Sequence, residues 1–144
     1  FYDVYETSDG KFVSIGALEP QFYKELLERL GLEGKAPAPM DHLNPAKWNE
    51  LRPTLVELFR TKTRDEWCEV FEGSDACFAP VLAAAEVFDH EHHRARRSFV
   101  DVDGVKHAVA APRFSRTKPA DPSPTRDRGA DTEAILAEIG VTLS

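Results

Sequence analysis

The sequence is poor in cysteine and has no long apolar run. Only two cysteines, Cys68 and Cys77, occur among its 144 residues, which is too few for a disulfide scaffold and is typical of a reducing compartment. We expect both thiols to be buried, as free cysteines usually are. No apolar stretch is long enough to cross a bilayer, and the first residues lack the charged-then-apolar pattern of a signal peptide. The sequence therefore predicts no membrane partner.

Basic residues and several familiar catalytic motifs are also scarce. Lys and Arg number 18 against 25 Asp and Glu, which gives a net charge of −7. Proteins that bind nucleic acid usually carry a basic surface, so this balance argues against a nucleic-acid partner. The sequence contains no Gly-x-Ser-x-Gly elbow, no phosphate-binding glycine loop and no dinucleotide fingerprint. The enzyme classes that depend on those motifs are therefore not indicated.

The remaining composition is that of a globular protein with a core. Hydrophobic residues make up 42% of the chain and include two Trp, three Tyr and nine Phe, which is ordinary globular usage. Residues 1–6 and 11–15 alternate polar and apolar side chains around the turn residues Ser8-Asp9-Gly10, which predicts a β-hairpin. Residues 20–30 then carry apolar side chains at helical spacing, and Gly31 predicts the end of that helix.

Two more helices and a strand are predicted in the middle of the chain. Three prolines predict an irregular connection over residues 34–45. A helix should follow to residue 60, with Pro53 as a break or a fresh start and with an inward apolar side of Trp48, Leu51, Leu55, Leu58 and Phe59. Thr63 and Glu66 have the spacing of a capping box for a helix that runs to about Phe71. Residues 76–81 have strand character, and Pro80 indicates a sheet edge or a strand end.

The last third of the chain predicts less compact structure. A short helix is expected over residues 83–88, and residues 98–102 and 105–109 alternate around Asp103-Gly104, a strong hairpin signal. Residues 111–127 read as an extended connector. A terminal helix should begin near Asp131 and end at Gly140, with an apolar side of Ile135, Leu136 and Ile139. We expect that side to be exposed in this chain. The overall prediction is an α+β fold of antiparallel hairpins packed with three or four helices.

Glu19 stands at the junction between the strand over residues 11–15 and the helix over residues 20–30. Pro20 suits the first helical position, so Glu19 falls at or beside the N-cap. Caps are usually Ser, Thr, Asp or Asn, and Glu is a poor substitute. The helix dipole would hold Glu19 as a carboxylate. It is either an exposed structural acid or an acceptor or base with a function.

Two charged clusters in the sequence are candidate binding sites. His90, His92 and His93 invite a metal interpretation, but only His90 and His93 can share a helix face, so we expect no metal site. The guanidinium groups of Arg94, Arg96 and Arg97 could bind the phosphates of CoA. A solvated helix end is the alternative for these arginines, and it is favoured because charge runs usually face water.

Five segments of the chain resemble one known family, in the same order and over nearly the whole sequence. They are residues 1–5, 16–23, 61–68, 75–82 and 129–140. They resemble the C-terminal part of the α-methylacyl-CoA racemases, which belong to the family III CoA-transferase superfamily. Members carry a large N-terminal region before this point, so the resemblance implies a C-terminal fragment. Residues 1–97 would be the small α+β domain, and residues 98–144 a hairpin, connector and terminal helix returning to the missing large domain.

The resemblance implies an isomerase and one site residue. In these racemases the Glu of the Gly-x-x-Glu-Pro-Gln-Phe-Tyr motif pairs with an active-site His, and Glu19 occupies that position in residues 16–23. The His, and the Asp that acts on the opposite face of the substrate, would lie outside this chain. The resemblance further implies an acyl-CoA thioester substrate, no separate cofactor, a role in fatty acid metabolism and an interlocked homodimer with its active site between subunits.

The chemistry implies that this chain does not act alone. Epimerising a 2-methylacyl thioester needs a base on each face of the α-carbon, and Glu19 is a single carboxylate. We therefore expect the isolated fragment to be inactive. The alternatives are a family III CoA-transferase that moves CoA between carboxylic acids and a non-catalytic dimerisation or binding module. Composition suggests a bacterial cytoplasm, whereas a eukaryotic relative would be mitochondrial or peroxisomal.

Overall fold

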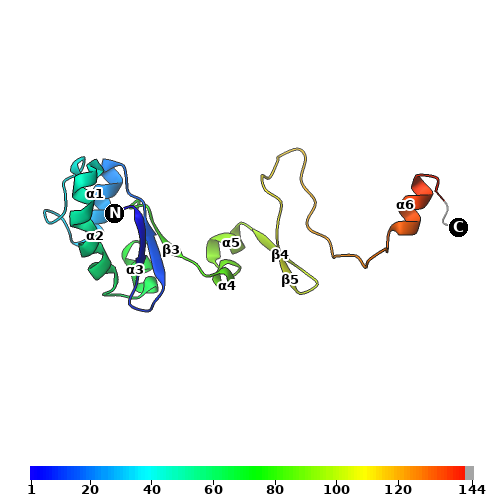
Figure 1. The fold of residues 1–144 in the computed structure, drawn as a ribbon, viewed down its shortest axis with the longest axis horizontal. Helices are drawn as coiled ribbons and strands as arrows, with labels where there is room; N and C mark the ends of the chain where they lie inside the picture. Colours follow the sequence, from blue (N-terminus) through cyan, green and yellow to red (C-terminus); the bar gives the residue numbers. More distant parts are fainter. Residues whose placement is uncertain (142–144) are drawn as a thin grey trace. The chain divides into compact units, whose positions relative to one another are not determined.

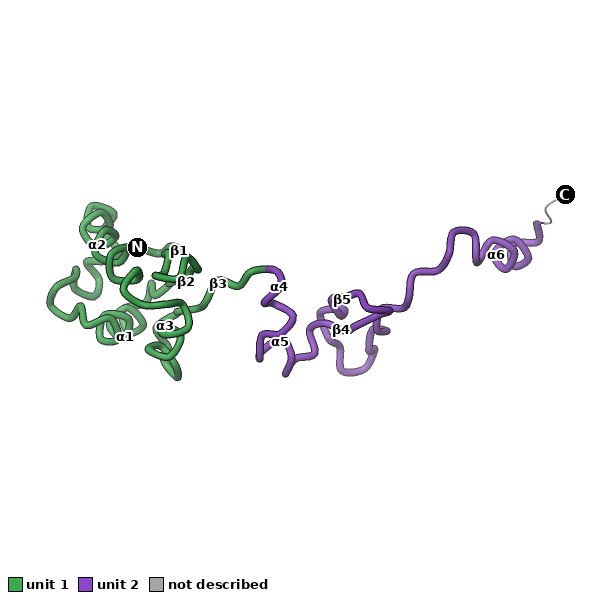
Figure 2. Tube along the Cα trace, turned by 90° about the horizontal axis from the view of Figure 1, so that it is seen from below, with its two compact units in different colours: residues 1–83 green, residues 84–144 purple. Residues whose placement is uncertain are grey.

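The structure is a computed structural model, and it describes residues 1–141. Two compact units make up the chain, residues 1–83 and residues 84–144, coloured green and purple in Figure 2. The expected domain boundary after Arg97 lies further along the chain than this division, and it remains a prediction for the whole protein. The last residues of the predicted segment 98–144, residues 142–144, lie outside the described residues.

A three-stranded antiparallel sheet organises the first unit. Strands β1 (Asp3–Glu6) and β2 (Phe12–Ile15) form the predicted hairpin, in which Tyr5 lies opposite Val13. Strand β3 (Phe78–Val81) pairs with the other side of β2, so the order is β1-β2-β3. Pro80 therefore lies on an edge strand, as predicted, where its missing N–H costs no ladder hydrogen bond.

Three helices pack with this sheet (Figure 1). Helix α1 (Pro20–Leu30) ends at Gly31, which adopts the left-handed conformation with φ of 66°. A 3-10 turn, η1 (Asp41–Leu43), interrupts the predicted irregular connection. Helix α2 (Pro45–Phe59) runs through Pro53 without a break, and α3 (Arg64–Val70) begins with the predicted capping box.

The core of the first unit lies between the sheet and these helices. It is built from aromatic and aliphatic side chains of β1, β2, α1, α2 and α3, together with residues of the connections: Phe1, Tyr5, Val13, Ile15, Ala17, Tyr23, Leu26, Leu27, Leu30, Leu32, Leu51, Leu55, Phe59, Trp67, Phe71 and Ala76. Sequence periodicity predicts the helical members of this set. The predicted inward position of Trp48 is wrong, because its side chain is 44% exposed and its indole N–H donates to the carbonyl oxygen of His42 at 2.7 Å.

The second unit contains two short helices and a hairpin. Helices α4 (Ala84–Val87) and α5 (Glu91–Ala95) precede strands β4 (Phe99–Val102) and β5 (Val105–Ala108). Asp103 and Gly104 both adopt positive φ, 52° and 80°, which is the geometry of a type I′ turn. The predicted hairpin is confirmed.

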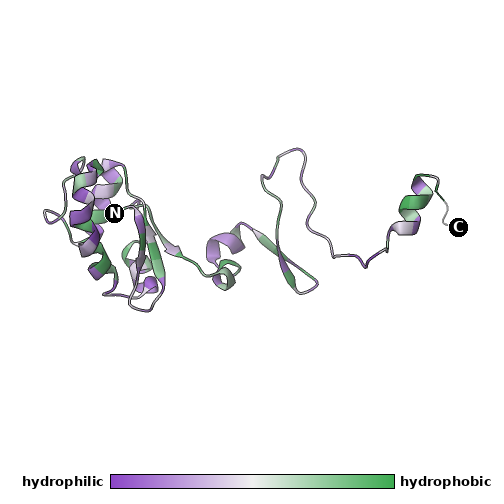
Figure 3. Ribbon diagram, in the orientation of Figure 1, coloured by the Kyte–Doolittle hydropathy of each residue, from purple (hydrophilic) through white to green (hydrophobic). Residues whose placement is uncertain are grey.

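A connector without helices or strands leads from this hairpin to α6 (Thr132–Glu138). The green bands of α6 in Figure 3 mark its apolar residues. Ile135 and Ile139 are 54% and 65% exposed within the described chain. The predicted helix and its exposed apolar side are therefore both confirmed.

Candidate functional site

Glu19 lies at the predicted junction of β2 and α1, and the backbone on both sides of it is held by hydrogen bonds. The N–H of Gly16 donates to the carbonyl oxygen of Cys77 at 3.0 Å, and the N–H of Leu18 donates to the carbonyl oxygen of Gly16 at 2.9 Å. Pro20 begins the helix, so Glu19 is the N-cap residue, with φ of −72° and ψ of 142°. The N–H of Tyr23 closes the first helical turn onto the Glu19 carbonyl oxygen at 2.9 Å.

The carboxylate of Glu19 does not serve its own helix. Its side chain is exposed, and it makes no capping hydrogen bond to α1 in the described chain. The positive end of the helix favours the ionised form of an acid at this position. The Glu19 carboxylate is thus an exposed hydrogen-bond acceptor on a backbone that is fixed by hydrogen bonds.

A buried histidine that sequence reasoning missed lies beside this junction. His42 is 1% exposed, and its Nε2 lies 2.7 Å from the carbonyl oxygen of Leu18. Its ring stacks on that of Tyr23, with centroids 4.0 Å apart and planes 7° apart. No periodic signal marks His42, because it lies in the proline-rich connection. A lone polar residue in such a segment usually faces water.

Cys77 is the other titratable neighbour of the junction. Partial desolvation by neighbouring atoms, followed by the charges of Glu19 and Asp75, raises the pKa of its thiol. Cys77 is exposed, whereas Cys68 is half-buried, so the prediction that both thiols are buried is wrong for Cys77. The burial prediction failed here because Cys77 lies in the connection before β3, and connections usually run over the protein surface.

The ring of Tyr2 covers Gly16 at the start of the motif. A Cβ added at Gly16 would lie 3.0 Å from Cε2 of Tyr2. This is tighter than ordinary contact, so a larger residue at position 16 would displace the Tyr2 ring. The ring is 63% exposed and is therefore free to move.

The histidine cluster lies on and beside α5. The rings of His90 and His93 are 5.7 Å apart, and His93 packs on Phe99 with ring centroids 5.6 Å apart. Within residues 1–141, no group of three or more His, Cys, Asp or Glu side chains is placed to hold a metal ion. The packing on Phe99 gives His93 a structural role in the second unit.

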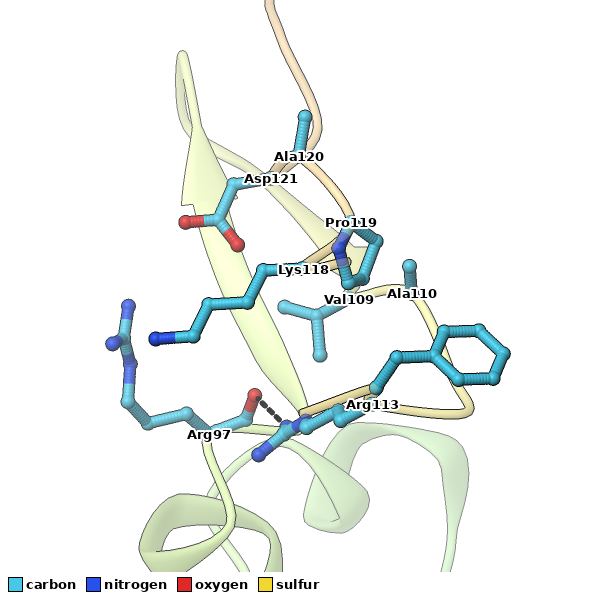
Figure 4. Close-up of a pocket in the computed structure, with 9 residues that line it drawn as sticks. Arg97, Val109, Ala110, Arg113, Lys118, Pro119, Ala120 and Asp121 are labelled. Atoms are coloured by element: carbon cyan, nitrogen blue, oxygen red, sulfur yellow. Dashed lines mark hydrogen bonds between the residues drawn. The ribbon is translucent and has the colours of Figure 1, made fainter. Parts of the chain in front are cut away.

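Of the arginines next to this cluster, Arg97 lines a cleft in the second unit (Figure 4). The cleft is lined by Arg97, Arg113, Lys118 and Asp121 together with small and apolar residues of the connector. Nη2 of Arg113 donates to the carbonyl oxygen of Arg97 at 2.9 Å, which ties the connector to the end of α5. The charged ends of Arg97, Lys118 and Asp121 face the same space in Figure 4, so a carboxylate offsets part of the positive charge. Binding of CoA phosphates by the arginine run remains a prediction.

No helix within residues 1–141 is long and apolar enough to cross a membrane.

Comparison with curated proteins shows similarity to two racemases. The chain is 44% identical over 144 residues to the alpha-methylacyl-CoA racemase of Mus musculus and 39% identical over 142 residues to that of Homo sapiens. Each alignment covers 97% of this chain and 37% of the relative. The chain therefore spans little more than a third of the length of these relatives.

Solved structures show the same fold. A CAIB/BAIF family protein from Brucella suis superposes with a TM-score of 0.72 at 23% identity, and the match covers 96% of this chain and 37% of that one. The predicted α+β fold is thereby confirmed. The sequence profile of CoA-transferase family III matches residues 1–132. The chain belongs to CoA-transferase family III.

Proposed function

We propose that the protein to which this chain contributes is a 2-methylacyl-CoA racemase, and that Glu19 is one of its site residues. The observation that carries the proposal is the exposed Glu19 carboxylate, which stands on a fixed backbone and makes no bond to its own helix. The two racemases similar to this chain support the same reaction class. The substrate would be a CoA thioester, and the reaction would need no separate cofactor.

The reaction is a proton exchange at the carbon next to the thioester carbonyl. A base removes the α-proton, the electron pair of the C–H bond forms the enolate, and the carbonyl oxygen takes up the negative charge. An acid then returns a proton to the opposite face. A carboxylate can orient an imidazole and stabilise its protonated form. Glu19 is proposed to do this for a histidine elsewhere in the protein.

A single carboxylate cannot complete this exchange. One group must act on each face of the α-carbon, and the partners of Glu19 would come from a region beyond these residues, in an interlocked dimer with the site between subunits. The chain of residues 1–144 should therefore be inactive by itself. Epimerisation by this chain at the rate of the whole protein would refute that part of the proposal.

The test uses the full-length protein and a matched pair of variants. Exchange of the α-proton of a chiral 2-methylacyl-CoA in deuterated water is followed by NMR for wild type, Glu19→Gln and Glu28→Gln. Glu28 is an exposed carboxylate on the same helix, 3.5 Å from Lys24, and serves as the control. Loss of an orienting or proton-transferring group should cost roughly 100-fold or more in kcat.

The outcomes separate the candidates. Exchange with loss of stereochemical purity, reduced in Glu19→Gln and unchanged in Glu28→Gln, would support the proposal. Equal rates in all three proteins would make Glu19 structural. Wild-type protein that transfers CoA between carboxylic acids without exchanging the α-proton would identify a CoA-transferase, the second candidate, which the family assignment also allows.

A further inference from the structure

His42 is a buried imidazole with both ring nitrogens engaged. Nε2 lies 2.7 Å from the carbonyl oxygen of Leu18, and the backbone N–H of Met40 donates to Nδ1 at 3.0 Å. A nitrogen that accepts from a backbone N–H carries no proton, so Nδ1 is the bare nitrogen. Nε2 therefore carries the proton and donates it to the Leu18 oxygen. The two partners select one neutral tautomer.

The bond to Leu18 fixes the peptide that leads into Glu19. A peptide unit is planar, so holding the oxygen of Leu18 also sets the direction of the Glu19 N–H and the position of its Cα. The next carbonyl oxygen, that of Glu19 itself, accepts from the N–H of Tyr23 at 2.9 Å. The Cα of Glu19 thus lies between two anchored carbonyl groups.

His42 and Tyr23, the residues that donate to these two carbonyl oxygens, pack against each other through their rings. The His42 ring stacks on the Tyr23 ring, and the edge of Phe1 packs on both, with ring centroids 5.7 Å from His42 and 5.4 Å from Tyr23. The Tyr23 hydroxyl donates to the carbonyl oxygen of Pro37 at 3.0 Å, and burial raises its pKa to about 12, so it remains a neutral donor. This cluster ties the proline-rich connection to the start of α1.

The backbone of His42 is also held from α2, because Trp48 donates its indole N–H to the backbone oxygen of His42 at 2.7 Å. Met40, whose N–H donates to Nδ1, adopts positive φ, 85°. A non-glycine residue in that region carries a backbone cost. Residues of the proline-rich connection thus hold the His42 ring in place, and Nε2 of that ring faces the peptide between Leu18 and Glu19.

We propose that His42 is a positioning residue for Glu19: it donates to the Leu18 carbonyl oxygen and thereby sets where the Glu19 carboxylate is presented. This inference rests on the proposed function of Glu19. His42 does not touch the reacting atoms in this assignment. It acts through the backbone, and its loss should lower kcat while leaving substrate affinity nearly unchanged.

Three substitutions in the full-length protein test the donor. His42→Gln keeps an N–H donor with a reach close to that of Nε2, His42→Asn offers the same amide on a shorter side chain, and His42→Leu removes the donor at similar volume. A displacement of a catalytic group by about 1 Å can cost roughly 100-fold. We expect kcat for α-proton exchange to fall about 10- to 100-fold in the Leu and Asn variants and to stay within about threefold in the Gln variant. If the Leu variant fails to fold, the Gln and Asn pair carries the test.

A double-mutant cycle distinguishes positioning from general stability. If His42 acts through Glu19, His42→Leu should cost less than about threefold further in a Glu19→Gln background. The same loss in both backgrounds would overturn the inference, and so would wild-type kcat in the Leu variant.

A measurement without turnover keeps the inference separate from the proposed function. Amide hydrogen exchange, followed by mass spectrometry, reports opening of the backbone over residues 16–23. It should quicken in His42→Leu and His42→Asn, but not in His42→Gln, with helix α3 as the internal reference. Unchanged exchange over residues 16–23 would overturn the assignment of His42 even if the protein proves to be a racemase. Faster exchange there would support it even if the enzyme proves to transfer CoA.

Discussion

Trp67 of α3 donates its indole N–H to the carbonyl oxygen of Phe59, the last residue of α2, at 2.9 Å. The last carbonyl groups of a helix have no partner inside the helix, and this one is buried at the edge of the Trp67 ring. The rings of Trp67 and Phe59 pack edge to face with centroids 5.1 Å apart. One side chain therefore both fills the core and ends α2.

The first prediction follows from this bond. Trp67→Phe keeps an aromatic ring but leaves the Phe59 oxygen buried without its donor, which should lower the free energy of unfolding by about 1–3 kcal/mol. Urea unfolding of the chain, followed by far-UV circular dichroism, measures it. Trp48→Phe is the control, because the Trp48 side chain is 44% exposed. Equal losses of unfolding free energy in both variants would show that leaving the buried Phe59 oxygen without a donor carries no extra cost.

Replacing Pro53 should raise the free energy of unfolding, because Pro53 lies inside α2 and cannot donate to the carbonyl oxygen four residues earlier. A proline inside a helix costs about 3 kcal/mol, whereas its stiffening of the unfolded chain returns only about 0.4–1 kcal/mol. Pro53→Ala should therefore stabilise the chain by about 2–2.6 kcal/mol in urea unfolding. Thr54→Ala, an exposed neighbour, should change stability by less than about 0.5 kcal/mol. A Pro53→Ala variant that is less stable than wild type would show that Pro53 stabilises the folded chain and would contradict the prediction.

The capping box of α3 predicts an acid-dependent part of stability. The backbone N–H and the hydroxyl of Thr63 both donate to Oε2 of Glu66 at 2.8 Å. The backbone bond, then the hydroxyl bond, lowers the pKa of Glu66 below its usual value of 4.5. A group whose pKa is lower in the folded state stabilises that state fully above its unfolded pKa, so this contribution is present above pH 4.5 and is lost as pH falls through the lowered value.

Glu66→Gln tests that contribution, because Gln can still accept from Thr63 but does not titrate. Between pH 6 and about pH 3, wild type should lose more stability in urea unfolding than Glu66→Gln does. Glu69→Gln, on the same helix outside the cap, should follow wild type. Parallel curves for wild type and Glu66→Gln would mean that the carboxylate is not held by Thr63 in solution.

Sequence patterns could predict most of the fold because the elements concerned carry local signals. The turn Asp103-Gly104, the cap Thr63 with Glu66, and Gly31 at the end of α1 all adopt the expected conformations. Pro53 was not predictable in the same way, since the interruption it favours locally is overcome by burial of Leu51, Leu55 and Phe59 on one side of α2.

The candidate site was predictable only in part. Glu19 stood out because a carboxylate at an N-cap followed by proline breaks a local preference. His42 gave no such signal, because its role depends on a contact with Leu18, far from it in the sequence, and on the stacking with Tyr23. Contacts of this kind come from the packing of the proline-rich connection, which periodicity does not encode.

The thiol of Cys77 offers the last prediction, as a probe of the Glu19 charge. The carboxylate of Glu19 is among the causes that raise the pKa of Cys77, and alkylating reagents react with the thiolate. Glu19→Gln should therefore lower that pKa and quicken alkylation of Cys77 by iodoacetamide at pH 8, measured by mass spectrometry of the peptide that contains it. Salt should shrink the difference, since an exposed charge is screened. Glu28→Gln should leave the rate unchanged. An equal rate in Glu19→Gln and wild type at low salt would place the carboxylate away from Cys77, and hence away from the orientation that the bond between His42 and Leu18 is proposed to set.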